Sequence, residues 1–266
     1  MQSPSSSLTL IVATTPIRVA SQDPGNPEPR TRLGIGLNGT LPWPRIKADM
    51  SFFARVTSRA PEPGTTNAII MGRKTYDSVP KHLRPLGKRI SAIITRDTTG
   101  SVRKGVEEDL KKRKEKMAAI AAAKAVENDK EQKDEPITDA IVVPSLDSAL
   151  EELQEIYGAG QALGKMFVIG GAEIYGAALR REFGDVDGLK RPLRIVMTNV
   201  VRKPEGGEEV PFECDTFWPL DCMDERNGWR SASPQELSEW VGEEVTGEWI
   251  REGDFEVQMV GYEKLI

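Results

Sequence analysis

The sequence is poor in the residues that build metal sites and disulfide frameworks. It has one histidine, His82, so a multi-histidine metal site is impossible, and Cys214 and Cys222 do not have the spacing of a zinc motif. His82 lies in a loop rich in proline and arginine, so we expect it at the surface, and no G-x-S-x-G elbow is present for a serine hydrolase. Two cysteines favour a reducing compartment, and we predict a cytoplasmic protein without a metal.

Long apolar runs and an excess of positive charge are also missing. No stretch approaches the ~20 apolar residues that span a bilayer, and residues 1–7 lack the basic and apolar parts of a secretory signal. The formal net charge is −5 over 266 residues, which disfavours a nucleic-acid partner. Any anionic ligand must therefore be bound by local groups of Arg and Lys. We expect no membrane partner and a monomer.

Apolar runs that alternate with helical patterns predict an α/β fold with a mostly parallel sheet. Strands are expected at 8–15, 67–71, 89–95, 140–143, 165–169, 193–200 and 254–262, and helices are expected to begin near residues 46, 74, 145 and 172. Residues 16–32 are predicted to form a loop. Residues 101–135 are rich in Lys, Glu and Ala and predict an exposed or partly disordered helical insertion, either a solvated spacer or a partner-binding helix. The pattern of residues 225–253 predicts no clear element.

An acidic residue lies on the apolar face of the first predicted helix. Ile46, Met50 and Phe53 form one stripe of this helix, and Asp49 lies within it. A buried carboxylate without a partner is costly. Asp49 is therefore either hydrogen-bonded to the protein or outside the stripe in the true register, or it faces a ligand in an apolar cleft, where its pKa would be raised.

Residues 34–39 match the pattern G-x-G-x-x-G but not its structural context. A dinucleotide fingerprint needs a strand directly before the glycines and a helix directly after them. A long predicted loop precedes Gly34. The segment that follows, Leu41-Pro42-Trp43-Pro44, cannot form a helix because it contains two prolines. The pattern therefore predicts a mobile glycine loop above a cleft.

Three predicted strands end in groups that suit an anion. Met71-Gly72-Arg73-Lys74-Thr75 offers free amides, cations and a hydroxyl at a helix start. Ile169-Gly170-Gly171 lets a ligand approach the backbone, although an ordinary strand–helix turn would look the same. Thr95-Arg96-Asp97 places an arginine that either binds phosphate or lies free at the surface. Because ligands collect at the carboxyl ends of strands in α/β sheets, the three together predict a phosphorylated dinucleotide.

Taken in order along the chain, these segments resemble dihydrofolate reductase. The motifs that carry the resemblance are Ile11-Val12-Ala13, Gly34 through Pro44, Asp49-Met50 with Phe53, Ile70 through Thr75, Arg84-Pro85-Leu86 with Arg89, Thr95-Arg96, Val168 through Tyr175, Thr198 and Asp215 through Pro219. Each motif is weak alone, but their number and order are specific. The resemblance implies one domain over residues 1–266, with about eight mostly parallel strands, an antiparallel C-terminal strand and insertions at about 16–32, 101–139 and 221–253.

The resemblance also implies an activity, the reduction of 7,8-dihydrofolate to tetrahydrofolate by NADPH, which supports one-carbon metabolism and the synthesis of thymidylate, purines and glycine. Asp49 would hold the 2-amino group and N3 of the pteridine and favour protonation at N5 through a water, while hydride arrives at C6. A threonine matching Thr198 would support that carboxylate, and Leu41 would lie between the two ligands. Arg89 would bind the glutamate α-carboxylate, and antifolates would compete for the site.

The remaining implied contacts follow from the same motifs. The implied substrate-binding residues are Ile11, Val12, Asp49, Met50, Phe53, Val79, Leu86, Arg89, Ile169 and Tyr175. The implied cofactor-binding residues are Ala13, Ile35, Gly36, Asn38, Gly39, Thr40, Gly72, Arg73, Lys74, Thr75, Thr95, Arg96, Asp97, Gly170, Gly171, Ala172, Glu173, Ile174 and Tyr175, with a cis bond between Gly170 and Gly171.

The sequence departs from the family pattern without losing a reactive group. Besides the insertions, Val79 follows Ser78, and Met50 stands where an aromatic residue is often found, so antifolate affinity does not carry over. Two other functions remain open. One is an NADPH-dependent reductase of the same fold acting on another pterin or a pyrimidine, which should lack the pair Asp49 and Arg89. The other is a non-catalytic scaffold that binds partners through residues 101–135.

Overall fold

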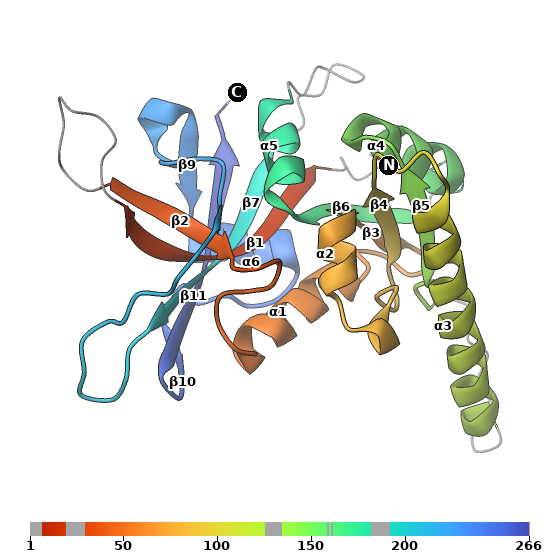
Figure 1. Ribbon diagram of the computed structural model, residues 1–266, viewed down its shortest axis with the longest axis horizontal. Helices are drawn as coiled ribbons and strands as arrows, with labels where there is room; N and C mark the ends of the chain where they lie inside the picture. Colours follow the sequence, from red (N-terminus) through yellow and green to blue (C-terminus); the bar gives the residue numbers. More distant parts are fainter. Residues whose placement is uncertain are drawn as a thin grey trace. The chain divides into compact units, whose positions relative to one another are not determined.

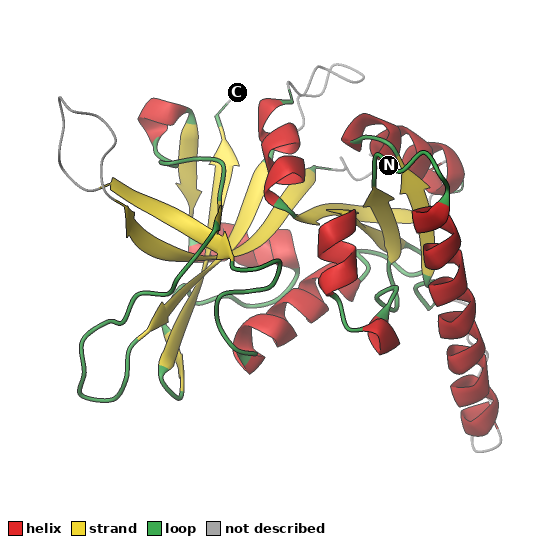
Figure 2. Cartoon of the chain, viewed as in Figure 1, coloured by secondary structure: helices red, strands yellow, loops and turns green. Residues whose placement is uncertain are grey.

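The computed structural model describes residues 7–19, 30–125, 135–158, 160, 162–181 and 192–265 (Figures 1 and 2). These residues form two compact units, which we describe one at a time. The terminal unit contains residues 7–56 and 179–265, and the central unit contains residues 57–178. The predicted division into a single domain stays a prediction.

The terminal unit is built on four strands in the order β10-β11-β7-β1. β1 (Leu8–Val19) runs parallel to β7 (Arg194–Arg202), and β11 (Phe255–Lys264) runs antiparallel to β7. The short β10 (Ile250–Glu252) pairs antiparallel with β11. The predicted strands near both ends of the chain and the antiparallel C-terminal strand are confirmed.

A strand that the sequence analysis missed follows β1. β2 (Arg30–Gly36) pairs antiparallel with β1 and also with β8 (Thr216–Phe217). The predicted loop over 16–32 is therefore wrong at both of its ends, while residues 20–29 lie outside the described residues. A Cβ atom at Gly34 would lie 2.3 Å from the Sγ of Cys214, so this glycine is required by close packing.

The glycine pattern ends in a tight turn. Leu37 and Thr40 exchange two backbone hydrogen bonds of 2.9 and 3.0 Å, and φ is +51° at Asn38 and +77° at Gly39. Positive φ at both central residues defines the two-residue hairpin turn that Asn-Gly favours. The predicted glycine loop over 34–39 is thus wrong, because these residues form a strand end and a hairpin turn.

The segment that predicted no element contains four of them. η3 (Glu225–Asn227) leads to β9 (Trp229–Ala232), which pairs with β11, and α6 (Pro234–Val241) precedes β10. Ser233 and Glu236 form a capping box at the start of α6, and Gly242, with φ +76°, ends it. The capping box is a sequence signal for a helix start that could have located α6.

The central unit contains four parallel strands in the order β6-β3-β4-β5. They are β3 (Thr66–Gly72), β4 (Ile90–Ile94), β5 (Asp139–Val143) and β6 (Leu163–Gly170). All five residues of β4 are buried, as predicted for a parallel strand covered on both faces. With the four strands of the terminal unit, the prediction of about eight mostly parallel strands is confirmed.

A helix follows each strand of the central unit, as predicted. These helices are α2 (Arg73–Ser78), α3 (Ser101–Ala125), α4 (Leu146–Leu153) and α5 (Ala172–Arg180), with the short η1 (Lys81–Leu83) and η2 (Gln154–Gly158). The side chain of Ser145 caps α4 by accepting a hydrogen bond from the amide of Ser148, which confirms the predicted helix start. His82 lies in η1 and is exposed, as expected.

The charged insertion forms helix α3, and its first half is attached to the central unit. Val106 is 3% exposed. Arg103 donates a hydrogen bond of 2.7 Å to the carbonyl of Val142, and Asp109 accepts one of 3.1 Å from the hydroxyl of Tyr76. The helical prediction is confirmed, but the spacer interpretation does not fit this half of the helix. Residues 126–134 lie outside the described residues.

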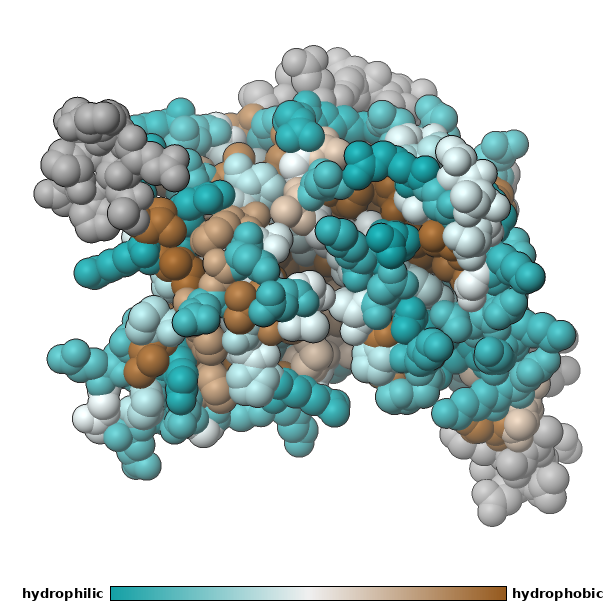
Figure 3. Space-filling model, viewed as in Figure 1, coloured by the Kyte–Doolittle hydropathy of each residue, from teal (hydrophilic) through white to brown (hydrophobic). Residues whose placement is uncertain are grey.

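The surface is mainly hydrophilic on the face drawn in Figure 3, with apolar residues confined to small areas. Among the described residues, no helix is long and apolar enough to cross a membrane. The same part of the chain holds no group of three or more His, Cys, Asp or Glu residues arranged to bind a metal ion.

Candidate active site

Helix α1 (Lys47–Ser58) carries a buried acid. Asp49 is 5% exposed and shares its face of the helix with the buried Ile46 and Phe52. Burial raises the pKa of Asp49 to about 6, and a hydrogen bond with the Thr198 hydroxyl on β7 opposes this rise. Asp49 therefore has a protein partner and also the raised pKa expected of a ligand-facing acid. Such a carboxyl can hold and release a proton near neutral pH.

The strands of the terminal unit bring further predicted residues to Thr198. Ala13 is the register partner of Thr198 in the parallel ladder, and Ile11 is that of Val196. Ile11 and Val12 are buried, whereas Ala13, Met50, Phe53 and Ile35 are partly accessible; Gly36 is buried, and Asn38, Gly39, Thr40 and Leu41 are exposed.

The buried Nε1 of Trp43 and Oγ1 of Thr14, both in the terminal unit, have no hydrogen-bond partner among the described residues. Trp43 packs edge-on against Phe212, with ring centroids 5.7 Å apart. An unsatisfied buried polar group costs about 1–3 kcal/mol, so a ligand or a bound water that satisfied these atoms would be stabilised.

Two glutamates that the sequence analysis missed hold helix α1 in place. Glu252 on β10 accepts hydrogen bonds of 2.8 and 2.9 Å from the backbone amides of Lys47 and Ala48. Glu243 accepts two hydrogen bonds of 2.8 Å from the guanidinium of Arg55 at the other end of the helix. A carboxylate at a helix N-terminus is favourable. Both acids come from the segment that sequence patterns did not place.

Two glycine turns meet in the central unit, where the parallel neighbours β3 and β6 end. A Cβ atom at Gly72 would lie 3.4 Å from Ile174, and one at Gly170, where φ is +138°, would lie 3.1 Å from Oγ1 of Thr75. The predicted cis bond between Gly170 and Gly171 is present. These glycines leave backbone open to a ligand where side chains would fill the space.

Cations surround these turns. Arg73 forms an ion pair of 2.8 Å with Asp77, and both side chains are about half exposed. Arg96, after β4, lies 3.6 Å from Glu173, which follows the second glycine turn, and both side chains are more than four-fifths exposed. Lys74 and Glu173 are exposed; Gly72, Thr75, Thr95, Ile169, Gly171, Ala172 and Ile174 are partly accessible; Gly170 and Tyr175 are buried.

Asp97 has a structural use in the central unit. Its carboxylate accepts hydrogen bonds of 2.9 Å from the amide of Thr99 and 2.8 Å from the amide of Val102. A hydrogen bond from the Thr99 hydroxyl, together with these two amide bonds and one from the Ser101 hydroxyl, holds the pKa of Asp97 well below its usual range. Its side chain therefore caps α3, a role that the sequence pattern, which predicted a cofactor contact here, did not reveal.

Arg89 is the second buried charge. It is 8% exposed, and it donates hydrogen bonds of 2.7 Å to the Thr57 hydroxyl and 3.0 Å to the Gly87 carbonyl. Burial lowers the pKa of Arg89 to about 10, with a smaller effect from Arg113, so Arg89 stays cationic at pH 7. Among the described residues no carboxylate forms an ion pair with it. The predicted neighbours Val79 and Leu86 are partly accessible.

Comparison with known proteins identifies the family. The dihydrofolate reductase family model matches residues 30–133. The dihydrofolate reductase of Pneumocystis carinii is 31% identical over 259 residues, covering 95% of this chain and 94% of that protein. The dihydrofolate reductase of Candida albicans is 28% identical, covering 84% and 86% of the two chains. The chain belongs to the dihydrofolate reductase family.

A solved structure supports the same fold. Schistosoma mansoni dihydrofolate reductase matches with a TM-score of 0.55 and 23% identity, covering 97% of this chain and 98% of that one. Membership of the dihydrofolate reductase family means that this chain is an NADPH-dependent oxidoreductase that reduces dihydrofolate. The two open alternatives, a different reductase and a non-catalytic scaffold, are therefore set aside.

Proposed function

We propose that Asp49 binds the 2-amino group and N3 of the pteridine and helps to protonate N5 through a water as dihydrofolate becomes tetrahydrofolate. The observation that carries this assignment is the buried carboxyl with a pKa of about 6. An ionised carboxylate accepts two parallel hydrogen bonds from such an edge. Its negative charge also favours a proton on the nearby ring nitrogen.

The other residues of the terminal unit keep this acid in place and limit water around it. Thr198 is a positioning residue, because it acts on the substrate through the Asp49 carboxylate. Met50, Phe53 and Ile11 supply apolar contact for a flat heterocycle, and the free indole N–H of Trp43 can hold the water. A site with little water strengthens each of these interactions.

NADPH fits the groups of the central unit. The glycines at 72, 170 and 171 leave space beside Thr75 that a Cβ atom would take, which suits a pyrophosphate close to the backbone. Arg73, Lys74 and Arg96 are the proposed phosphate-binding cations, joined by the Thr75 and Thr95 hydroxyls. When bound, NADPH supplies the hydride. We propose no phosphate contact for the Asp97 side chain, because its carboxylate caps α3.

Arg89 is the proposed binding residue for the α-carboxylate of the substrate's glutamate. Thr57 and Gly87 fix its guanidinium through two hydrogen bonds. No carboxylate among the described residues neutralises it, so an anionic ligand would gain a charge-assisted hydrogen bond. Val79 and Leu86 are proposed as contacts for the benzoyl part of the substrate.

Replacing Asp49 with asparagine tests the proposed role. We expect Asp49→Asn to lose about 10²–10⁴-fold of turnover at pH 7, because an amide carries no charge to favour protonation of N5. Activity should recover in part in acid, where the substrate becomes protonated without help. The measurement is the loss of near-ultraviolet NADPH absorbance with dihydrofolate across pH 5 to 9.

The control in this experiment is NADPH binding, followed by fluorescence, which should be unchanged in the variant. Turnover equal to that of the wild type at pH 7 would remove Asp49 from the mechanism. Loss of NADPH binding together with turnover would point to a damaged fold, which circular dichroism would detect.

We further propose that the protein works as a monomer in the cytoplasm and that antifolates compete for the Asp49 site. Cys214 and Cys222 are free thiols, which suits a reducing compartment. Sedimentation at micromolar concentration tests the first point, and competition of an antifolate with dihydrofolate in wild type and in Asp49→Asn tests the last.

A further inference from the structure

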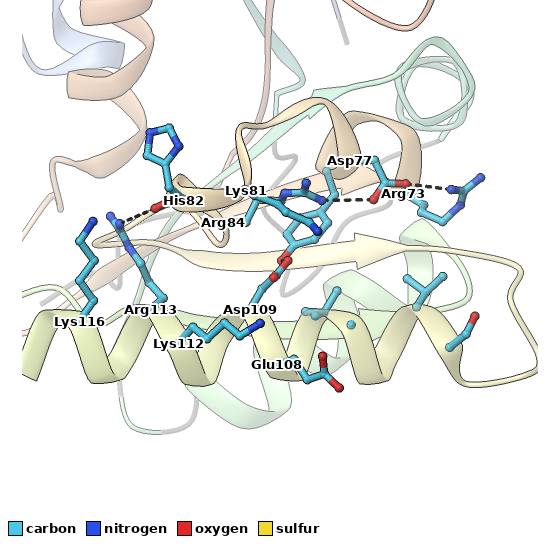
Figure 4. A pocket seen from close by; sticks show the side chains of 15 residues that line it. Arg73, Asp77, Lys81, His82, Arg84, Glu108, Asp109, Lys112, Arg113 and Lys116 are labelled. Atoms are coloured by element: carbon cyan, nitrogen blue, oxygen red, sulfur yellow. Dashed lines mark hydrogen bonds and ion pairs between the residues drawn. The ribbon is translucent and has the colours of Figure 1, made fainter.

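A cavity of the central unit lies between helix α3 and residues of α2, η1 and Arg84. Its volume is about 710 Å³. The lining includes six Lys or Arg side chains and three Asp or Glu side chains, a formal balance of +3 in a chain whose net charge is −5. Figure 4 shows Arg113 and Lys116 reaching from α3 toward His82, with Arg73 and Asp77 at the opposite end. We call this cavity the α3 pocket.

Two of the three acids that line the α3 pocket are already bound to other side chains. Asp77 pairs with Arg73 at 2.8 Å and with Arg84 at 3.4 Å, and Asp109 accepts a hydrogen bond from Tyr76. Glu108 is the remaining acid of the lining.

Several hydrogen-bond donors that line the α3 pocket lack an acceptor. Within the part of the chain that the structure describes, the buried Nε atoms of Arg84 and Arg113 have no hydrogen-bond partner. Arg113 makes one long hydrogen bond of 3.3 Å to the His82 carbonyl, and no carboxylate in the described part of the chain pairs with Lys112 or Lys116. Unpaired guanidinium donors in a partly buried cavity favour an anionic ligand.

Arg113 also lies next to the buried cation of the substrate site. The Arg89 Nε donates to the Gly87 carbonyl at 3.0 Å, and a Cβ atom built on Gly87 would lie 2.9 Å from Nη2 of Arg113. The two guanidinium groups therefore pack on opposite parts of one glycine. Their like charges repel each other, since Arg113 helps to lower the pKa of Arg89, and an anion between or beside them would offset this repulsion.

We propose that the α3 pocket is a tail-binding subsite, in which Arg113 binds the second carboxylate of the substrate's glutamate and Lys116 binds carboxylates further along a γ-linked extension. This inference rests on the proposed role of Arg89, which takes only one of the two carboxylates of a glutamate. The pocket is larger than a single carboxylate needs, so it can hold a longer anionic tail. The inserted helix α3 thus sets specificity for the end of the substrate that does not react.

The test compares dihydrofolate carrying one glutamate with dihydrofolate carrying three γ-linked glutamates, at low ionic strength where surface charges are least screened. We expect the wild-type KM to be about tenfold lower for the longer substrate, which corresponds to about 1.4 kcal/mol. The double variant Arg113→Ala/Lys116→Ala should raise the KM of the shorter substrate a few-fold and remove the advantage of the longer one. The double variant should change KM and leave kcat unchanged, and the change in KM should become smaller as salt is added.

Lys111→Ala is the matched control, because Lys111 is exposed on α3 and does not line the pocket. This variant should keep the full difference in KM between the shorter and the longer substrate. An advantage of the longer substrate that survives in the double variant, or no advantage in the wild type, would overturn the subsite. A changed KM for NADPH with an unchanged tail effect would also overturn it, because the pocket would then serve the cofactor.

The same data separate this inference from the proposed function. If the subsite is absent but Arg89 and Asp49 act as proposed, the shorter substrate is still reduced and Arg89→Ala still raises its KM. If Arg89→Ala leaves both KM values unchanged, the proposed function of Arg89 fails. Thermal unfolding of the double variant shows whether helix α3 remains folded, and Arg113→Lys, which keeps the charge, should retain part of the tail effect.

Discussion

Asp49 and Arg89, one in each unit, are buried to nearly the same degree and respond to burial in opposite directions. Asp49 is 5% exposed and Arg89 is 8% exposed, and each is hydrogen-bonded to a threonine hydroxyl. Burial favours the neutral form of both. It raises the pKa of Asp49 to about 6 and lowers that of Arg89 to about 10. The same physical effect thus makes one group able to exchange a proton near pH 7 and leaves the other a permanent charge.

Removing the permanent charge should have the largest effect on substrate binding. We expect Arg89→Ala to lower kcat/KM for dihydrofolate by about 100-fold, since truncating one partner of a buried charge pair costs about 2–5 kcal/mol. The loss should appear mainly in KM, measured by steady-state kinetics with saturating NADPH. Arg89→Lys should recover only part of it, because a lysine cannot reproduce the two fixed hydrogen bonds. A KM within twofold of the wild type would show that Arg89 does not contact the substrate.

The titration of Asp49 should make the free energy of unfolding depend on pH. The pKa of Asp49 is about 6 in the folded protein against 3.8 for a free carboxyl, so the folded state binds the proton more tightly. The resulting stabilisation is fully present below pH 3.8 and is lost as the pH rises through about 6. At pH 7.5 the carboxylate therefore destabilises the fold, by at most about 3 kcal/mol.

Asp49→Asn should remove this penalty. We expect urea unfolding at pH 7.5 to show a variant more stable than the wild type by up to about 3 kcal/mol, with the difference shrinking toward pH 4. All other titrating groups are shared and cancel in the comparison. A difference between the two proteins that does not depend on pH would mean that the Asp49 pKa is not raised.

The two threonines offer a smaller and sharper contrast. Because the Thr198 hydroxyl lowers the pKa of Asp49, Thr198→Val should move the pKa further above its ordinary value. The pH profile of kcat/KM should shift to higher pH. The shift should correspond to about 1 kcal/mol, which is the typical contribution of one hydrogen bond. Thr57→Val, the matched control in the other unit, should raise the KM for dihydrofolate without moving the profile. Equal shifts of the pH profile in both variants would contradict the assignment of Thr198 as the residue that lowers the pKa of Asp49.

Residues that lie close together in sequence were the ones that sequence patterns could place. The helical stripe of Ile46 and Asp49, the Gly72 turn and the Gly170–Gly171 turn each depend on a few neighbouring residues, and the structure contains all three. Asp49 illustrates the limit of this reasoning. Its place on an apolar helix face predicted burial, but its partner Thr198 came only from resemblance, since the pairing depends on how β7 packs.

What sequence patterns missed depends on contacts between distant residues. Gly34 was assigned to a loop because its packing partner, Cys214, is far away in the chain. The Arg113 side chain looked like part of a solvated helix, because the proximity of Gly87 follows from how α3 packs. The capping box at Ser233 was the exception, since that signal is local and was not used.

The smallest effect should come from Glu252, which influences Asp49 through helix α1. Its carboxylate accepts from the Lys47 and Ala48 amides, so Glu252→Gln removes a charge from the helix N-terminus and one of two acceptors. We expect a loss of about 1 kcal/mol in the free energy of unfolding and a fall of less than about fivefold in kcat, because Asp49 lies one residue beyond this cap. The KM for NADPH should not change.

Arg251→Gln, at the neighbouring position on β10, is the control, because Arg251 pairs with Glu256 and makes no contact with α1 among its described bonds. A loss of kcat as large as that of Asp49→Asn would mean that Glu252 itself takes part in the chemistry, whereas a loss of stability with unchanged kcat would show that α1 keeps Asp49 in position without the cap.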